Sequence, residues 1–415
     1  MGIKQRLTPS HCCYFSLHSM PVITPPFPQR ITSVDAYRGL VMVLMMAEVF
    51  EFAHVSEALP QSAFWAFLHH HQDHVPWLGC SLHDLIQPSF SFLVGVALPY
   101  SIASRSSQSQ SRTALWLHTI RRSLILILLG IFLRSMSRSQ TNFTFEDTLT
   151  QIGLGYPFLF ALGFRSERTS WIALGVILVG YWLLFALYPI AGPEFDWSQA
   201  GVAAGWEHHL NGFAAHWNKN ANAAWAFDRW FLNLFPQGKV FLFNGGGYAT
   251  LSFVPTLGTM ILGLIAGKWL RSIKQPQLLL RNFILTAIGL FATALLLEWT
   301  GINPIVKRIW TPAWTLFSGG WCFLFLAMFY YLADVKNFKG AFFPLVVVGM
   351  NSIAAYLLAH TVVEFIDSSF RINISQTYDL LLGAPYKTLI SGLVILGVEW
   401  WILYWMYTKK LFIKI

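Results

Sequence analysis

Ten runs of mostly apolar residues limit this chain to a small set of folds, because a helix that crosses a bilayer needs about 20 such residues in succession. The runs that reach or approach this length cover residues 39–54, 85–104, 114–133, 149–164, 171–191, 251–270, 283–299, 314–332, 342–363 and 389–407. Of the 415 residues, 55% are hydrophobic and only 11% are charged, whereas a soluble domain carries roughly a quarter charged residues. The sequence therefore predicts an all-α fold, a polytopic transmembrane bundle of about ten helices.

The distribution of Lys and Arg predicts how these helices are oriented. If the N-terminus is cytoplasmic, 19 of the 28 basic residues fall in cytoplasmic segments and the other 9 fall outside, which agrees with the positive-inside rule. Both termini are then cytoplasmic. The basic residues cluster at the ends of apolar runs and form no stripe with interleaved aromatics, so the net charge of +9 does not indicate nucleic-acid binding.

The chain divides into a polar, Pro-containing lead-in, residues 1–29, and a single transmembrane domain, residues 30–410. Within that domain, the predicted outer loop 192–250 is enlarged and carries five tryptophans: Trp197, Trp206, Trp217, Trp225 and Trp230. Indole faces can stack on sugar rings, but aromatic belts at the membrane interface are commoner. The composition alone favours the interfacial interpretation.

Ionisable residues gather where the first, second and ninth runs meet the predicted outer boundary. Glu48 and Glu51 are three residues apart and share one face of a continuous helix, Asp84 opens the second run, and His360 lies near the outer end of the ninth. Such groups within a membrane mark functional sites or buried pairs. His74 ends a histidine-rich segment before Asp84, and a neutral imidazole is a competent general base near neutral pH. We interpret the preceding histidines, 69–71, as solvated loop rather than as ligands, and we expect no metal.

Four further residues lie at the predicted cytoplasmic ends of the helices. Asp35 and Arg38 flank the entry to the first run, and Arg121 and Arg122 fall in the inner part of the third. Guanidinium groups match phosphate oxygens in pairs and can therefore hold a phosphorylated cofactor. They also act as topology determinants without any ligand, which composition alone favours.

Several strings of the sequence resemble blocks of a known family. They are Arg30-Ile-Thr-Ser-Val-Asp35-Ala-Tyr-Arg38-Gly39-Leu, then His74-Val-Pro-Trp77-Leu-Gly79 followed by Asp84-Leu-Ile-Gln-Pro88, then Gln151-Ile-Gly-Leu-Gly-Tyr156, Leu251 to Gly267, and Gly349-Met-Asn351-Ser-Ile-Ala-Ala-Tyr356. In this order they resemble the catalytic domain of the heparan-alpha-glucosaminide N-acetyltransferases and their bacterial relatives, from Arg30 to about Val363. The His-Trp-Gly-Asp-Pro block is the specific part, because it combines rare residues at fixed spacing.

The resemblance implies a membrane enzyme that passes an acetyl or other acyl group from cytosolic acetyl-CoA to an amine or hydroxyl of an extracytoplasmic sugar or glycan. The essential histidine of the family falls on His74, as acyl acceptor or general base, with Asp84 as its orienting carboxylate. The substrate-binding residues that we expect are Glu48, Glu51, Trp77, Asn351, Tyr356 and His360. The residues that we expect to bind the acetyl-CoA co-substrate are Asp35, Arg38, Arg121 and Arg122.

Two other functions stay open at this point. One is a transporter of amino sugars or oligosaccharides, in which the same acids serve as proton-coupled sites, although transporters often contain inverted repeats and none is evident here. The other is a non-catalytic membrane sensor or scaffold. A bacterial inner membrane is the expected location, the lipid bilayer is the one certain partner, and the sequence leaves a homodimer open.

Overall fold

The computed structural model describes residues 2, 31–107, 111–236 and 238–413, and within this part it contains helices and no strand. The predicted lead-in 1–29 lies outside the described residues except for Gly2. Residues Ile31–Ile415 form one compact unit. Its α-helices are α1 Thr32–Met46, α2 Phe52–Ala58, α3 Ala63–Gln72, α4 Ile86–Ser106, α5 Arg112–Ser135, α6 Thr148–Gly163, α7 Glu167–Ala186, α8 Ala223–Phe231, α9 Phe253–Ser272, α10 Pro276–Trp299, α11 Pro312–Phe329, α12 Phe343–Gly349, α13 Ser352–Thr361, α14 Val363–Asn373 and α15 Lys387–Thr408.

Short turns of 3₁₀ helix connect or extend these helices: η1 Ala47–Phe50, η2 His83–Leu85, η3 Gly212–Trp217, η4 Leu232–Leu234, η5 Thr250–Ser252, η7 Tyr378–Leu380 and η8 Ala384–Tyr386, while η6 Tyr330–Val335 is a π-helical end of α11. Several α-helices start at a side chain that accepts a backbone N–H of the first turn. Those caps are Ser111 for α5, Asp147 for α6, Ser166 for α7, Asn222 for α8 and Thr311 for α11.

Each of the ten predicted runs coincides with helix, but the described residues contain fewer unbroken spans than ten. Seven helices are long and apolar enough to cross a membrane, and two bent pairs bring the number to nine. The bent pairs are α1–η1 with α2, which turns by 43°, and α12 with α13, which turns by 80°. The remaining run, 149–164, is α6, which at 16 residues is short for a spanning helix of about 20 residues.

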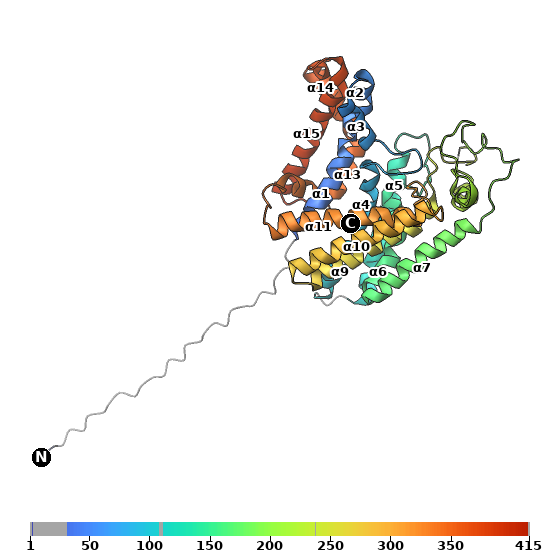
Figure 1. The fold of residues 1–415 in the computed structure, drawn as a ribbon. Helices are drawn as coiled ribbons and strands as arrows, with labels where there is room; N and C mark the ends of the chain where they lie inside the picture. Colours follow the sequence, from blue (N-terminus) through green and yellow to red (C-terminus); the bar gives the residue numbers. More distant parts are fainter. Residues whose placement is uncertain (1, 3–30, 108–110, 237, 414–415) are drawn as a thin grey trace. The chain divides into compact units, whose positions relative to one another are not determined.

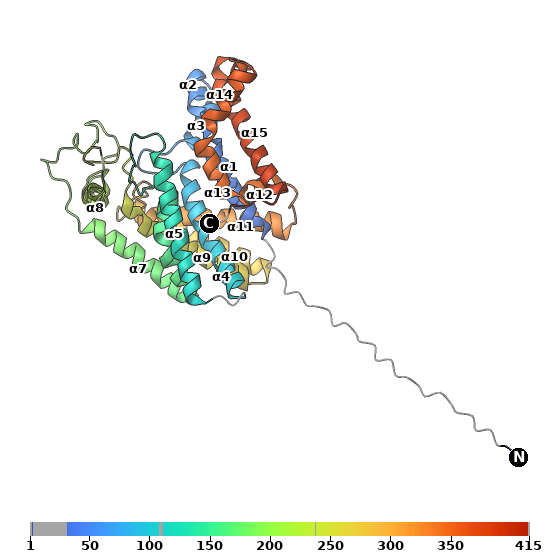
Figure 2. The same ribbon diagram turned by 180° about the vertical axis from the view of Figure 1, so that it is seen from behind.

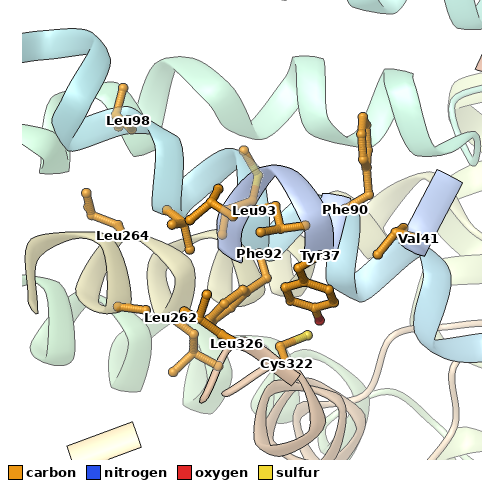
Figure 3. Packing of buried hydrophobic residues seen from close by; sticks show 14 of the residues in the cluster. Tyr37, Val41, Phe90, Phe92, Leu93, Leu98, Leu262, Leu264, Cys322 and Leu326 are labelled. Atoms are coloured by element: carbon orange, nitrogen blue, oxygen red, sulfur yellow. The ribbon is translucent and has the colours of Figure 1, made fainter. Parts of the chain in front are cut away.

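Close approach of α4 and α9 creates the centre of the bundle, and glycines on both helices make it possible. A Cβ atom at Gly95 of α4 would lie 2.0 Å from the carbonyl oxygen of Met260, and one at Gly263 of α9 would lie 1.9 Å from that of Phe92. Small residues at such positions let membrane helices pack backbone to backbone. Around this contact, apolar side chains of α1, α4, α9 and α11 form the main core (Figure 3).

Glycines also let α1 and α12 pack closely, and this contact places the break between α12 and α13 beside the first span. A Cβ at Gly39 would lie 1.8 Å from the carbonyl oxygen of Leu345, and one at Gly349 would lie 1.9 Å from that of Asp35. These contacts fix the start of α1 against α12. Its other end is fixed as well, because the η1 extension of α1 packs on α15. Figures 1 and 2 show α2, α3 and α14 gathered at one end of this unit.

The long predicted outer loop is a folded element that packs on the end of α7. Its core contains Trp217, which stacks on Phe185 of α7 with the ring centroids 6.3 Å apart and the planes 3° apart. Trp77, from the segment before α4, is fully buried in the same cluster, and its indole N–H donates to the carbonyl of Trp217 at 3.1 Å. The loop is therefore held directly against the segment that carries His74.

Candidate active site

A cavity of about 450 Å³ lies between α1, η2, α4, the end of α5, the start of α6 and α13. Its polar lining falls into two groups, which we name by their cations. The lysine cluster consists of Glu48, His74, His83 and Lys307, together with the buried Asp84 behind them. The arginine cluster consists of Arg134, Glu146, Asp147 and Tyr356. His360 also lines the cavity and stacks on Tyr356, with the ring centroids 4.4 Å apart.

Asp84 holds the imidazole of His74 in a fixed orientation. The His74 Nδ1 lies 2.8 Å from Asp84 Oδ1, and Asp84 Oδ2 accepts hydrogen bonds from the backbone N–H of Val75 at 3.3 Å and from the N–H and hydroxyl of Ser81 at 3.0 and 3.1 Å. The Asp84 side chain is 0% exposed, whereas that of His74 is 34% exposed. Because the carboxylate is an acceptor, it favours the tautomer with the proton on Nδ1, which makes Nε2 the ring nitrogen that carries the lone pair.

Lys307, in the loop between α10 and α11, completes this cluster and was missed by the sequence analysis. Its ammonium lies 3.2 Å from Asp84 Oδ1 and 2.9 Å from His74 Nδ1. The neighbouring Arg308 donates to the carbonyl of Val75 and to that of Gly246. The only sequence signal for this pair is that two adjacent basic residues stand on the side where the positive-inside rule predicts few.

Glu48 reaches the cavity and Glu51 does not. Glu48 Oε1 lies 3.0 Å from Nε2 of His83, whose ring centroid is 4.5 Å from that of His74. The prediction that Glu48 and Glu51 share one helix face is wrong, because α1 ends at Met46 and continues as the tighter turn η1. Glu51 then takes the left-handed conformation, with φ of 44°, and its side chain is exposed.

The arginine cluster is fixed by one carboxylate with three partners. Asp147 accepts from the Tyr356 hydroxyl at 3.1 Å, lies 3.3 Å from Nε of Arg134, and caps α6 through the N–H of Leu149 at 2.9 Å. Next to it, Glu146 accepts a hydrogen bond from the Asn244 side chain of the outer loop. Burial raises the pKa of the Glu146 carboxyl, so this acid holds its proton more readily than an exposed glutamate.

Besides Glu51, two more of the residues expected to bind substrate, Trp77 and Asn351, do not line the cavity. Trp77 is packed under the outer loop. Asn351, at the break between α12 and α13, is 1% exposed; its side chain donates to the carbonyl of Leu411 at 2.7 Å and accepts from the N–H of Ile413 at 3.0 Å. It anchors the segment that follows α15.

None of the four residues expected to bind the co-substrate is among the described residues that line this cavity. Asp35 and Arg38 form an ion pair of 3.4 Å at the start of α1. Arg122 donates to the Tyr156 hydroxyl at 3.0 Å and lies over its ring, 4.6 Å from the centroid. Arg121, one position earlier in α5, is exposed.

A second cavity, of about 210 Å³, opens near the start of α5 and the end of α6. Its lining residues are Arg112, Trp116, Ala161, Phe164 and Arg165. Two guanidinium groups and two aromatic rings therefore surround one small space. Because α5 and α6 pack side by side, this cavity lies farther along the helix pair from the contact between Arg122 and Tyr156.

The environment of His74 favours its neutral form. Burial lowers the pKa of this imidazole, and the charge of Lys307 lowers it further, while the hydrogen bond to Asp84 acts in the opposite direction. A neutral imidazole next to an ionised carboxylate can accept a proton or attack an electrophile. Among the described residues, no group of three or more His, Cys, Asp or Glu side chains is arranged to hold a metal ion.

Comparison with known proteins gives two similar sequences. No family model matches the chain. It is 26% identical to the heparan-alpha-glucosaminide N-acetyltransferase of Homo sapiens over 94% of this chain and 60% of that protein. It is 25% identical to the enzyme of the same name from Mus musculus, over 98% of this chain and 64% of that protein. The chain thus spans somewhat less than two thirds of these relatives. Both similarities agree with the resemblance to the heparan-alpha-glucosaminide N-acetyltransferases that the sequence motifs carry.

Proposed function

We propose that this chain is a membrane-bound acyltransferase that moves an acetyl group from cytosolic acetyl-CoA to an amine or hydroxyl of a sugar on the opposite side of the membrane. The observation that carries the proposal is the pair of His74 and the fully buried Asp84, 2.8 Å apart, at a cavity lined by candidate membrane-spanning helices and the loops between them. The similarity to two heparan-alpha-glucosaminide N-acetyltransferases supports the same reaction.

In one route, His74 acts as a general base. Its Nε2 takes the proton from the acceptor amine or hydroxyl while that nitrogen or oxygen attacks the thioester carbonyl. The C–S bond then breaks, and the imidazolium returns the proton to the departing CoA thiolate. Asp84 stabilises the imidazolium through Nδ1–H, which is the interaction that the 2.8 Å contact provides.

In the other route, His74 carries the acetyl group. Nε2 attacks the thioester and the C–S bond breaks, which gives an acetyl-imidazolium and the CoA thiolate. The acceptor then attacks the acetyl carbon, the bond from that carbon to Nε2 breaks, and the acceptor's proton passes to the thiolate or to water, so that the neutral imidazole is regenerated. Asp84 has the same orienting role in this route, because Nδ1 must keep its proton for Nε2 to be the nucleophile.

The acceptor would lie among the polar groups that share the cavity with His74. Glu48, held by His83, and His360 supply hydrogen-bond acceptors, and Tyr356 is positioned by Asp147. Sugar hydroxyls need several such partners at fixed positions, because a buried polar group without one is costly. A carboxylate such as Glu48 would also favour an acceptor that carries an amine.

The nucleotide part of acetyl-CoA would bind at the other end of the α5–α6 pair, which the distribution of basic residues predicts to be cytoplasmic. Arg112 and Arg165 of the second cavity can pair with phosphate oxygens, and Trp116 offers a face for the adenine ring. Arg121 and Arg122 of the same helix, and Arg38 paired with Asp35, would add positive charge at this end.

A transfer assay in proteoliposomes tests the proposal. The vesicles are loaded with glucosamine, radiolabelled acetyl-CoA is added outside, and labelled sugar trapped inside is measured. The proposal predicts trapped N-acetylglucosamine with the wild type and with His70→Ala, whose histidine is exposed at the end of α3, and loss of the product with His74→Ala. Efflux of unmodified glucosamine without acetylation would instead support a transporter.

A further inference from the structure

We propose that Lys307 is a positioning residue for this reaction: its ammonium holds His74 neutral and Asp84 ionised. Nε2 of His74 then stays unprotonated at pH values at which an ordinary histidine would be a cation. This inference rests on the proposed function for its consequence but not for its physical content. It assigns a role to a residue that lies 233 positions from His74 in the sequence.

The position of the ammonium carries the argument. Lys307 Nζ lies 2.9 Å from Nδ1 and 3.3 Å from Nε2 of His74, and 3.2 Å from Asp84 Oδ1. One nitrogen cannot form straight hydrogen bonds to both ring nitrogens, because their lone pairs or protons point in divergent directions. The contact with the ring is therefore chiefly that of a charge beside it, while Asp84 is the direct ion-pair partner.

Burial makes this charge effective. The Lys307 side chain is 4% exposed and that of Asp84 is 0% exposed, so water screens their fields weakly. Burial lowers the pKa of the Lys307 ammonium, while the adjacent Asp84 carboxylate acts in the opposite direction and favours the charged form. The ring of Tyr248 also faces the ammonium, 5.9 Å from its centroid, which favours a cation.

The titratable groups around His74 come from several parts of the fold; His69 and Asp73, at the end of α3, line a shallow pocket with it, and His360 of α13 lines the main cavity. From η2 come Asp84, whose carboxylate favours the imidazolium, and His83, whose ring is 4.5 Å away. From η1 comes Glu48, which is engaged by His83. From the α10–α11 loop comes Lys307, the one cation in direct contact with the ring among the described residues. Without Lys307, the carboxylates dominate and the imidazole would gain a proton more easily.

The titration of His74 can be measured without any enzyme activity. The rate at which diethylpyrocarbonate modifies each histidine follows its neutral fraction, and peptide mass spectrometry separates His74 from the others. In the wild type, the midpoint for His74 should lie below that for the exposed His70. An equal or higher midpoint for His74 would overturn the inference even before any variant is made.

Three variants then isolate the charge of Lys307. Lys307→Met should raise the His74 midpoint by about one pH unit or more, and Lys307→Arg should return it toward the wild-type value. Lys219→Met is the matched control, because Lys219 is also buried, at 9% exposure, but lies over Trp206 in the outer loop. Its His74 midpoint should not change. Folding of every variant is checked by its thermal unfolding.

Acetyl transfer gives the second readout. In Lys307→Met, the acidic limb of the pH–rate profile should move to higher pH with the His74 midpoint, so that activity returns in alkaline buffer. A loss of rate that is equal at every pH, with an unmoved His74 midpoint, would show that Lys307 is only structural. If no variant transfers acetyl groups but the midpoint shifts as expected, the proposed function fails and the role of Lys307 in setting the His74 charge stands.

Discussion

The substitution Asp84→Asn should separate the orienting role of this carboxylate from the integrity of the fold. Asp84 is surrounded by donors: His74 Nδ1 at 2.8 Å, the N–H and hydroxyl of Ser81 at 3.0 and 3.1 Å, the N–H of Val75 at 3.3 Å and Lys307 Nζ at 3.2 Å. An amide keeps the shape but removes the charge, and its NH₂ must face some of these donors. The preference for the Nδ1–H tautomer of His74 and the stabilisation of its cation are then lost.

The expected loss of rate follows from the value of one charge-assisted hydrogen bond. Such a bond contributes about 1.5–3 kcal/mol, which corresponds to roughly a 10- to 150-fold fall in kcat for acetyl transfer. The assay compares acetyl transfer to glucosamine by purified protein in nanodiscs, with thermal unfolding measured in parallel.

The matched control is Asp73→Asn. Asp73 is the neighbour of His74 and accepts its backbone N–H at 2.7 Å through an oxygen that asparagine retains, and its side chain is 72% exposed. We expect this variant to keep at least about half of the activity. A folded Asp84→Asn protein that transfers acetyl groups at the wild-type rate would refute the assignment of Asp84 as the orienting carboxylate.

Three further predictions concern the fold and the second cavity. Gly263→Ala should destabilise the protein by about 3 kcal/mol or more, because the added Cβ would lie 1.9 Å from a backbone carbonyl oxygen. Gly289→Ala on α10 is the control: its added Cβ would have no described atom within 4 Å, so the thermal unfolding temperature should stay unchanged or rise slightly. Trp77→Phe removes the hydrogen bond to the outer loop and should speed tryptic cleavage of that loop while His74 stays modifiable by diethylpyrocarbonate. Arg165→Gln should raise the KM for acetyl-CoA several-fold with little change in kcat, and an unaltered KM would remove the second cavity from the binding site.

The spanning helices were predictable because lipid imposes a simple requirement: every backbone polar group must be paired within the chain, and the side chains must be apolar. All ten runs are accordingly helical. The breaks were not predictable, because they depend on backbone conformation and not on hydropathy. Glu51 shows this directly: its left-handed backbone ends the first span and separates its side chain from that of Glu48.

The sequence pointed to four residues that line the cavity, His74, Glu48, Tyr356 and His360, because each is a polar group at the predicted outer end of an apolar run or next to one. His74 and Asp84 stand ten positions apart and form a recognisable pattern, and the structure brings them into contact. Lys307 joins them only because the α10–α11 loop folds back onto the segment before α4, a contact that no local pattern encodes. Trp77 was expected to bind substrate, whereas in the structure its ring is buried under the outer loop and its N–H donates to the backbone carbonyl of Trp217.

The most direct test of the central claim is the dependence of acetyl-CoA consumption on His74. Purified wild type, His74→Ala and His70→Ala are compared in nanodiscs with radiolabelled acetyl-CoA and glucosamine. The account predicts labelled product from the wild type and from His70→Ala, and at least about a 100-fold loss with folded His74→Ala. Equal turnover by the wild type and His74→Ala, or no turnover by a well-folded wild-type preparation with any short acyl-CoA and amino sugar, would contradict it.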